Sequence, residues 1–400
     1  MDGKTTLSRS QLGIILAAFA LTSVSMGKMM IISGFSGFSA EFPEIPLVTK
    51  QLLISVASLS GIPVALLMGK MAGYVSKKNL AIAASLLFAL GGLVPIFTES
   101  FAVMFAARCV TGFGMAMCST LATSVIAEHF TGSLRSRLIG YNSAVKSLFG
   151  IGFSYFGGLL ALNSWRSAYW LHGIGFVILL LVLLFLPNER LPGKHERETV
   201  QRANIHITGP VWYYSFAAVM MFVFFSAHGN NISLLFAENR IGSASQAGVA
   251  SAAFTLGGFL SGLLFHNVYR RLKAATQIVG YVLSGISLLL MGMSGSYPMI
   301  CMESFVFGLG FYLIIPHQTL LVTEAVSKET YTMAAAIYLG AINLGQVISP
   351  FVLELLSRAF PGGVSGRYLV AGIGLLAMAL LAVLREWLQS KKKSVYSQTH

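Results

Sequence analysis

Long apolar stretches separated by short polar ones constrain this chain more than any other feature of its sequence. A helix that crosses a membrane needs roughly 20 mostly apolar residues, and only 10% of this chain is charged, against roughly a quarter of a soluble domain. We therefore predict an all-α polytopic membrane protein. Its first apolar stretch is expected to be retained, because it is too long for the apolar core of a signal peptide. Twelve spans are expected, at about 11–35, 51–69, 80–97, 101–126, 139–161, 168–186, 210–236, 246–265, 274–295, 298–322, 333–356 and 366–386.

The basic residues indicate how these spans are oriented. With twelve spans, both termini lie on one side, and the segments expected on that side hold 19 of the 27 Lys and Arg residues, against five on the other side and three within spans. Cytoplasmic loops carry an excess of Lys and Arg. This predicts a multi-pass protein of the plasma (inner) membrane with both termini in the cytoplasm, and it explains most of the net charge of +13 without a nucleic-acid partner.

The longest polar interruption divides six spans from six. It predicts an N-terminal six-helix bundle at 1–186, a cytoplasmic linker at 187–209, a C-terminal six-helix bundle at 210–387 and a basic cytoplasmic tail at 388–400. An internal repeat crosses the linker. The loops at 69–78 and 262–271 both begin with glycine and end with a basic pair, at a constant offset of 193 residues. Such a repeat predicts two homologous halves.

Three stretches of the chain resemble signatures of the major facilitator superfamily of secondary transporters. Arg108, Gly112 and Gly114 resemble the signature of span 4, and Trp165-Arg166 precedes span 6 as such a pair often does in the family. The loop after the second span resembles the family pattern G-x-L-A-D-R-x-G-R-R. The matching residues are Gly69, Met71, Ala72, Lys77 and Lys78.

The chain departs from the family pattern in two places. The Asp of the loop signature is Gly73 in the first half and His266 in the second, so the charge relay that this Asp makes in the family is in doubt. Span 5 lacks the Gly-Pro of the family's antiporter signature. Its absence weakens an interpretation as a drug antiporter.

The resemblance implies a major facilitator fold, in which two pseudo-symmetric six-helix bundles surround a central cavity. Spans 1, 4, 7 and 10 would line this cavity, with spans 5 and 11 beside it, and the unusual polar residues of the chain fall in these spans. Candidate substrate-binding residues are Lys28, Asn142, Lys146, His228, Asn230, Asn231, Asn343 and Gln346. Candidate coupling or gating residues are Arg108, Glu303 and His317. Candidate residues of the conformational loops are Gly69, Gly73, Lys77, Lys78, His266, Arg270 and Arg271.

Each of these residues also has a structural interpretation. The ammonium groups of Lys28 and Lys146 could instead extend to the membrane surface, and Arg108 could hydrogen-bond within its own half, as this arginine often does in the family. The histidines and asparagines would then bridge helices. Lys50 and Glu354 lie at span ends and are expected to be solvated.

Glycine next to a polar residue at similar depth in spans 1 and 7 suggests that both helices loosen locally. The two pairs are Gly27-Lys28 and Gly229-Asn230. Irregular helix of this kind is typical of binding sites in transporters. We therefore expect the helix to be loosened locally near a site at both places.

The sign of the embedded charges predicts the class of substrate. Lys28, Arg108 and Lys146 lie within spans together with one well-embedded acid, Glu303, so the cavity implied by the resemblance is net positive and favours an anion. We predict a secondary active transporter that moves a small organic anion, most simply a carboxylate, with a coupling ion. Arg108 and Glu303 are expected to pair across the outer gate, and protonation of Glu303 to loosen that pair. The alternative is an exporter of drugs or other amphipathic compounds by proton antiport.

Other protein classes lack support in the sequence. The chain has no His-Glu-x-x-His, Gly-x-Ser-x-Gly or P-loop motif, which argues against an enzyme and against coupling to ATP. Cys109, Cys118 and Cys301 lie in apolar stretches, without the spacing of a disulfide framework or a metal site. We expect no cofactor and no metal. The expected partners are a small-molecule substrate, a coupling ion and the lipid bilayer, with the protein as a monomer.

Overall fold

The computed structural model describes residues 8–59, 63–64, 68, 71, 74–188, 208–326, 331–360 and 362–398. This part of the chain is helical and contains no strand. Ten of its helices are long and apolar enough to cross a membrane. Two shorter apolar helices, Leu47–Leu59 and Ala144–Leu160, lie where the second and fifth spans are expected. The predicted all-α membrane fold is confirmed, and the described helices are consistent with twelve spans.

The chain forms two compact units, Met1–Asn204 and Ile205–His400. The division falls within the polar stretch at 187–209, of which 189–207 lie outside the described residues. The predicted domain boundaries stay a prediction. At the other end of the second unit, the last helix continues through most of the basic stretch expected as a tail, to Gln398.

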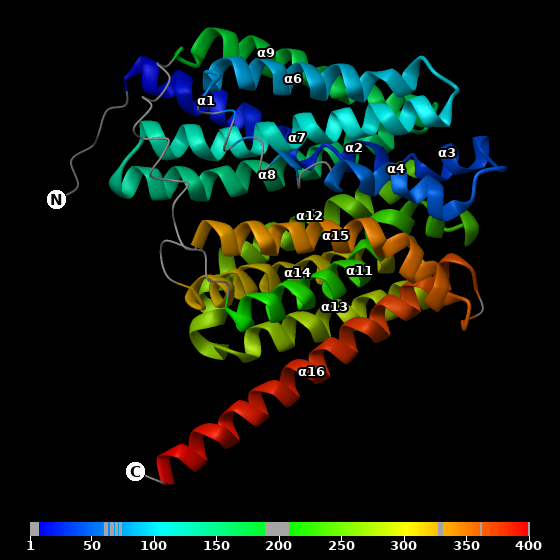
Figure 1. The fold of residues 1–400 in the computed structure, drawn as a ribbon. Helices are drawn as coiled ribbons and strands as arrows, with labels where there is room; N and C mark the ends of the chain where they lie inside the picture. The colour runs from blue at the N-terminus through cyan, green and yellow to red at the C-terminus, as the bar shows by residue number, and fades with distance from the viewer. Residues whose placement is uncertain are drawn as a thin grey trace. The chain divides into compact units, whose positions relative to one another are not determined.

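The first unit contains helices that correspond to six spans, several of them broken into shorter pieces (Figure 1). In chain order they are α1 (Arg9–Ser23), η1 (Val24–Met26), α2 (Met29–Ile32), α3 (Phe35–Glu41), α4 (Leu47–Leu59), α6 (Lys77–Leu93), η2 (Val94–Ile96), α7 (Phe101–His129), α8 (Gly132–Leu160), η3 (Trp165–Gly173) and α9 (Ile174–Phe185). Serine side chains begin three of them, and Ser164 accepts from the Arg166 amide at η3. Ser8 forms a capping box with Gln11 at α1, and Ser76 accepts from the Asn79 amide at α6.

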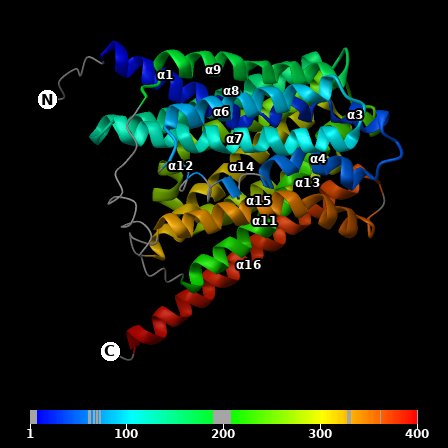
Figure 2. The ribbon, with the colours of Figure 1, turned by 45° about the horizontal axis from the view of Figure 1, so that its top comes forward.

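The second unit is built from six long helices. They are α11 (Gly209–Glu238), α12 (Ala244–Leu272), α13 (Ala275–Met293), α14 (Tyr297–Glu324), α15 (Tyr331–Ser357) and α16 (Val364–Gln398). Within each unit the same pairs of helices pack together. The second packs on the fourth (α4 on α7, α12 on α14), the third on the fourth and sixth, and the first on the fifth (α2 on α8, α11 on α15). Both views of the ribbon show α12 and α14 side by side (Figures 1 and 2). This shared packing confirms two pseudo-symmetric bundles.

Glycine allows the second and fourth helices of each unit to approach closely. A Cβ atom on Gly112 of α7 would lie 2.4 Å from the Ala57 carbonyl oxygen of α4. In the second unit a Cβ on Gly308 of α14 would lie 2.0 Å from the Phe254 oxygen of α12. Small residues permit such backbone approach in membrane helices. The Gly112 of the span 4 signature therefore has a packing role.

Candidate functional site

The first membrane helix is interrupted at Lys28. α1 ends at Ser23, the 3₁₀ turn η1 follows, and α2 begins only at Met29, so that Gly27 and Lys28 lie between two helical pieces of one apolar span. The expected loosening is present here. The corresponding expectation at Gly229 and Asn230 is wrong, because both lie inside the continuous helix α11. A glycine next to a polar residue is therefore not sufficient to break a membrane helix.

Asn142 and Lys146 lie one turn apart on α8, the helix that packs against the interrupted span. Residues four apart share a helix face, and α8 packs against η1 and α2 as well as α1. The Thr22 hydroxyl of α1 donates to the Asn142 side-chain oxygen, one and a half turns before Lys28. Lys28 and Lys146 are both partly buried. The structure thus brings the elements that carry Lys28, Asn142 and Lys146 together in one unit.

Arg108 is fully buried in the first unit and joins three of its elements. Its Nε donates to the Leu53 carbonyl oxygen of α4 at 3.2 Å, and its Nη1 lies 3.5 Å from the His172 Nε2 of η3. Its Nη2 has no hydrogen-bond partner among the described residues. These contacts match the structural interpretation of Arg108. The pairing of Arg108 with Glu303 stays a prediction.

His228 and Asn231 of α11 are buried and contact neighbouring helices of the second unit. His228 Nε2 lies 3.1 Å from the Ser304 hydroxyl of α14. The Asn231 amide nitrogen donates to the Ala227 oxygen at 2.8 Å, and its side-chain oxygen accepts from Arg367 at 3.2 Å. The bonds to Ser304 and Arg367 bridge helices, as in the structural alternative for both residues, whereas the bond to Ala227 lies within α11.

The remaining polar candidates of the second unit lie on three helices. Asn230 of α11 and Gln346 of α15 are buried, and Asn343 of α15 is partly buried. His317 of α14 is buried, and its Nδ1 has no partner among the described residues.

Glu303 of α14 is a buried carboxyl group without a salt bridge. Its side chain is 4% exposed, and its Oε2 has no hydrogen-bond partner in the described part of the chain. An ionisable residue at membrane depth is costly, and such residues are typically functional. Glu303 is therefore the strongest candidate of this unit for a protonation step.

Lys50, which was expected to be solvated, is buried. Its side chain is 5% exposed, and its Nζ donates to the carbonyl oxygens of Ser39 and Phe42 at 2.8 and 3.0 Å. The Lys50 ammonium therefore links α4 to the end of α3. The two carbonyl oxygens take the place of the water that would otherwise solvate the charge.

Glu354 was likewise expected to be solvated, but its carboxylate has a partner within the protein. It forms an ion pair with Arg367 of α16, which is itself buried. Together with Asn231 these side chains link α11, α15 and α16. Arg367 lies at the start of the last expected span and was not among the predicted site residues, so this site was missed.

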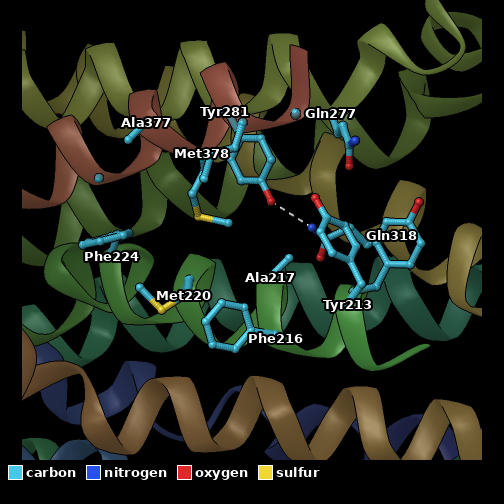
Figure 3. A pocket seen from close by; sticks show the side chains of 14 residues that line it. Tyr213, Phe216, Ala217, Met220, Phe224, Gln277, Tyr281, Gln318, Ala377 and Met378 are labelled. Carbon is cyan, nitrogen blue, oxygen red and sulfur yellow. Dashed lines mark hydrogen bonds between the residues drawn. The ribbon is translucent and has the colours of Figure 1, made fainter. Parts of the chain in front are cut away.

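Gln318, the polar residue one position after His317, lines a cavity of about 340 Å³ within the second unit. Its amide nitrogen donates to the Tyr281 hydroxyl at 2.8 Å, and its oxygen accepts from Tyr338 at 2.9 Å. Figure 3 shows Gln318 and Tyr281 beside the apolar lining of this cavity. No pattern in the sequence indicates this cavity.

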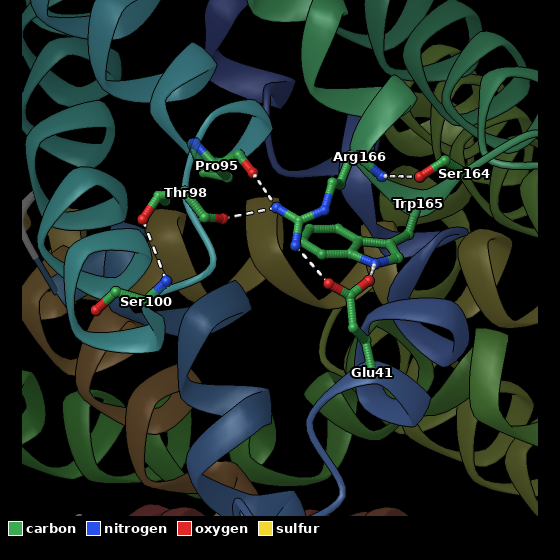
Figure 4. A network of polar contacts seen from close by, with 7 residues as sticks. All are labelled: Glu41, Pro95, Thr98, Ser100, Ser164, Trp165 and Arg166. Atoms are coloured by element: carbon green, nitrogen blue, oxygen red, sulfur yellow. Dashed lines mark hydrogen bonds and ion pairs between the residues drawn. The ribbon is translucent and has the colours of Figure 1, made fainter.

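The Trp165-Arg166 pair holds the end of the first span through Glu41 (Figure 4). The Trp165 indole donates to Glu41 Oε2 at 2.5 Å, and Arg166 forms an ion pair with Glu41 Oε1. Arg166 also donates to the carbonyl oxygens of Pro95 and Thr98. Partial burial raises the pKa of Glu41, but the bonds from Trp165 and Arg166 outweigh it and hold the pKa below its ordinary value. The carboxylate therefore stays charged and fixes α3 to η3.

A related contact exists in the second unit. Glu238, the last residue of α11, accepts from the Val364 amide at 3.2 Å, and Asn239 donates to the Ser365 hydroxyl at 3.1 Å. In both units a glutamate at the end of the first span thus holds the start of the sixth.

The loop signature is only partly described. Gly69 and Gly73 lie outside the described residues. Lys77 forms an ion pair with Glu128 at the end of α7, and the Lys78 Nζ donates to the Leu183 oxygen of α9 at 2.8 Å. In the second unit the corresponding residues are exposed near the end of α12: His266, Arg270 and Arg271.

Comparisons with solved structures agree with this architecture. The chain is similar to a bacterial homologue of the human lysosomal transporter Spinster in an inward-facing, unoccupied state, with 15% identity, 95% of this chain and 96% of the other covered, and a TM-score of 0.73. It is also similar to a mutant of the nucleoside transporter NupG, with 11% identity, 93% and 99% coverage and a TM-score of 0.78. A POT family transporter in complex with a thioalcohol-conjugated peptide gives 12% identity, 93% and 95% coverage and a TM-score of 0.72. At these identities the likeness shows the fold alone.

Two curated relatives match part of the chain, and a family profile identifies the family. The multidrug resistance protein MdtL of Escherichia coli O81 (strain ED1a) is 25% identical over 148 residues, which are 36% of this chain and 38% of MdtL. MdtL of Escherichia coli O6:H1 matches to the same extent. The match thus spans less than two fifths of the curated relatives' length. The family profile of the Major Facilitator Superfamily matches residues 17–240 and 214–398. The chain therefore belongs to the Major Facilitator Superfamily, whose members are transporters and not enzymes.

Proposed function

We propose that this transporter moves a small organic anion, most simply a carboxylate, and that Lys28 and Lys146 hold its charge. The observation that carries the proposal is the sign of the charges at membrane depth in the first unit. Three cations, Lys28, Arg108 and Lys146, lie in its expected spans, and these spans contain no Asp or Glu. A fixed positive charge in a low-dielectric surrounding attracts an anion and repels a cation.

The local structure at Lys28 supports a binding role. Discontinuous membrane helices are typical of substrate sites in secondary transporters, and Lys28 lies at such a discontinuity. Lysine binds a carboxylate as a flexible point charge, which suits a site that must release its ligand. Arg108 is already bonded to Leu53 and His172, so it contributes to the field and not to direct contact.

Amide groups complete the proposed set of substrate contacts. Asn230, Asn343 and Gln346 are proposed to hydrogen-bond the substrate, and Asn230 and Gln346 also have partners within the protein. Asn142 and Asn231 already bond to Thr22 and Arg367, so we give them the role of positioning helices.

We propose coupling to protons through Glu303, with His317 as a second candidate. Glu303 is a buried carboxyl group whose Oε2 lacks a partner in the described part of the chain, so its charge state can follow a local change of surroundings. The protein is proposed to act as a monomer in the plasma (inner) membrane with both termini cytoplasmic, as the charge distribution predicts.

The test is uptake of a panel of radiolabelled carboxylates and organic cations into proteoliposomes. Lys28→Gln and Lys146→Gln are expected to weaken apparent affinity for the transported anion by about tenfold or more, as the loss of a hydrogen bond to a charged group does. The control is Lys273→Gln, which removes an exposed lysine at the end of α12. Normal transport by Lys28→Gln, or transport of cations alone, would refute the proposal.

A second candidate function is export of drugs or other amphipathic compounds by proton antiport. The match to MdtL, named a multidrug resistance protein, favours it. The absence of Gly-Pro in span 5 counts against it. Susceptibility of cells to lipophilic drugs with and without the gene separates the two functions, because a carboxylate transporter leaves it unchanged.

A further inference from the structure

The cavity of about 340 Å³ in the second unit is separate from the proposed substrate residues. It lies among α11, α13, α14 and α16, and none of Lys28, Lys146 or Glu303 lines it. Its size is at the lower end of the range of about 300–1,000 Å³ that is usual for ligand pockets. Most of its wall is apolar, with Phe216, Ala217, Met220 and Phe224 on one side (Figure 3). It can therefore hold a hydrocarbon chain.

The long axis of this lining follows α11. Tyr213 and Phe224 both line the cavity, and Phe224 is the eleventh residue after Tyr213 along α11, which corresponds to a rise of about 16 Å along the helix axis. A space with this extent and an apolar wall matches an acyl chain better than a compact polar solute.

One polar group of the lining lacks a hydrogen bond. Gln277 of α13 is 4% exposed and makes no hydrogen bond to the residues that the structure describes. Gln318 and Tyr281, by contrast, bond to each other. Gln277 therefore offers a donor and an acceptor to a ligand in the cavity.

A positive charge lies at the same end of the cavity as its tyrosines. Arg385 of α16 donates from Nη1 to the Tyr214 hydroxyl at 2.6 Å, and its guanidinium lies 4.2 and 4.6 Å from the ring centroids of Tyr213 and Tyr214. Both tyrosines line the cavity. Among the described residues Arg385 forms no salt bridge. The cavity thus has a fixed cation beside it that forms no salt bridge among the described residues, with the Glu386 carboxylate near enough to act on the same Tyr214.

Exposed tryptophans place the end of the cavity near Arg385 at the membrane surface. Trp212 and Trp387 are 58% and 52% exposed, and tryptophan gathers at the interface between membrane and water. The sequence continues beyond them with Lys391, Lys392 and Lys393 in the last turns of α16. Arg385 therefore lies at the level of lipid headgroups, and the apolar lining extends from there toward the hydrocarbon.

We infer that this cavity binds an anionic phospholipid from the adjacent leaflet. One acyl chain occupies the apolar lining, the phosphate contacts Arg385, and Gln277 bonds a polar atom of the glycerol ester. Charge complementarity selects this occupant, since an anionic headgroup balances Arg385. The site is distinct from the proposed substrate site and does not depend on the identity of the transported solute.

Native mass spectrometry of the purified protein with equal amounts of phosphatidylglycerol and phosphatidylethanolamine tests this inference. Wild type is expected to retain phosphatidylglycerol preferentially, and Arg385→Gln to reduce that retention about tenfold. The matched control is Arg358→Gln, which removes an exposed arginine directly after the end of α15. Ala217→Phe fills the cavity and is expected to reduce binding of both lipids.

A measurement on wild type alone covers the case in which a variant fails to fold. Dodecyl phosphate is expected to raise the melting temperature, because a ligand that binds only the folded state stabilises it, whereas inorganic phosphate at the same concentration does not. Equal retention of the two lipids by wild type, unchanged retention by Arg385→Gln or Ala217→Phe, or equal stabilisation by the two phosphates would each overturn the inference.

Discussion

The ion pair between Arg367 and Glu354 is expected to be strongly coupled, and its coupling energy can be worked out from the structure. Arg367 of α16 is buried, with a side chain 6% exposed, whereas Glu354 of α15 is 35% exposed. Arg367 also donates to Asn231 of α11 at 3.2 Å. One guanidinium therefore holds three helices of the second unit.

The two partners differ in how well water can replace the lost contact. Breaking a fully buried pair costs about 3–5 kcal/mol, because one charge remains uncompensated, and an exposed pair contributes less than about 1 kcal/mol. Glu354→Gln leaves the buried guanidinium with Asn231 alone, which we place between these limits, at about 2 kcal/mol. Arg367→Met leaves a carboxylate that can turn to water, at a cost of about 1 kcal/mol.

Removing both charges relieves most of this penalty, so the double variant is expected to lose only about 1 kcal/mol, about 2 kcal/mol less than the sum of the single variants. The assay is the free energy of unfolding of the purified protein, from titration with SDS in mixed micelles followed by circular dichroism. Arg358→Met, at an exposed arginine of the same region, is the control and should change stability by less than about 0.5 kcal/mol. Additive losses in the double variant would refute the assignment of a buried, coupled pair.

Two further predictions concern the contact of Glu41 with Trp165 and Arg166 in the first unit, and the crossing of α12 and α14 in the second unit. Because the pKa of Glu41 lies below its ordinary value of 4.5, its contribution to stability is present at neutral pH and is lost as the pH falls below that value. Glu41→Gln should therefore lower the free energy of unfolding at pH 7, by at most about 1 kcal/mol because the carboxylate is 42% exposed, and by progressively less as the pH falls below 4.5. A Cβ at Gly308 would meet the Phe254 oxygen at 2.0 Å, so Gly308→Ala should destabilise the protein by about 1–3 kcal/mol, whereas Gly262→Ala, with nothing within 4 Å, should not. Equal melting temperatures of the two glycine variants would contradict this packing.

The fold could be predicted from the sequence because hydrophobicity and charge act over whole segments. Spans of about 20 apolar residues are required by the thickness of the bilayer, and the repeated loops at 69–78 and 262–271 pointed to two halves. These signals do not depend on any single side chain. They therefore hold even where the exact ends of helices differ from expectation.

Side-chain partners could not be predicted in the same way. Lys50 and Arg367 lie at the ends of expected spans, yet both are buried. Lys50 is bonded by carbonyl oxygens near the loop between α3 and α4, and Arg367 by Asn231, which is distant in the chain. The cavity beside Gln277 and Gln318 depends on the packing of four helices. Such sites depend on three-dimensional neighbours, which composition and spacing do not contain.

The helices of the two halves correspond at a different sequence offset from the one at which their loops repeat. The loops repeat at 193 residues, but the helix crossing at Ala57 and Gly112 recurs at Phe254 and Gly308, an offset of 196 or 197. Gly229-Asn230 lies 202 residues after Gly27-Lys28, which matches neither offset, so it is not the structural counterpart of that pair.

At the structural offset of 197, the counterpart of Lys28 is Phe225. Its ring stacks on Phe311 with centroids 3.6 Å apart and lies 5.6 Å from Phe307. The same position of the repeat is thus cationic in the first unit and aromatic in the second.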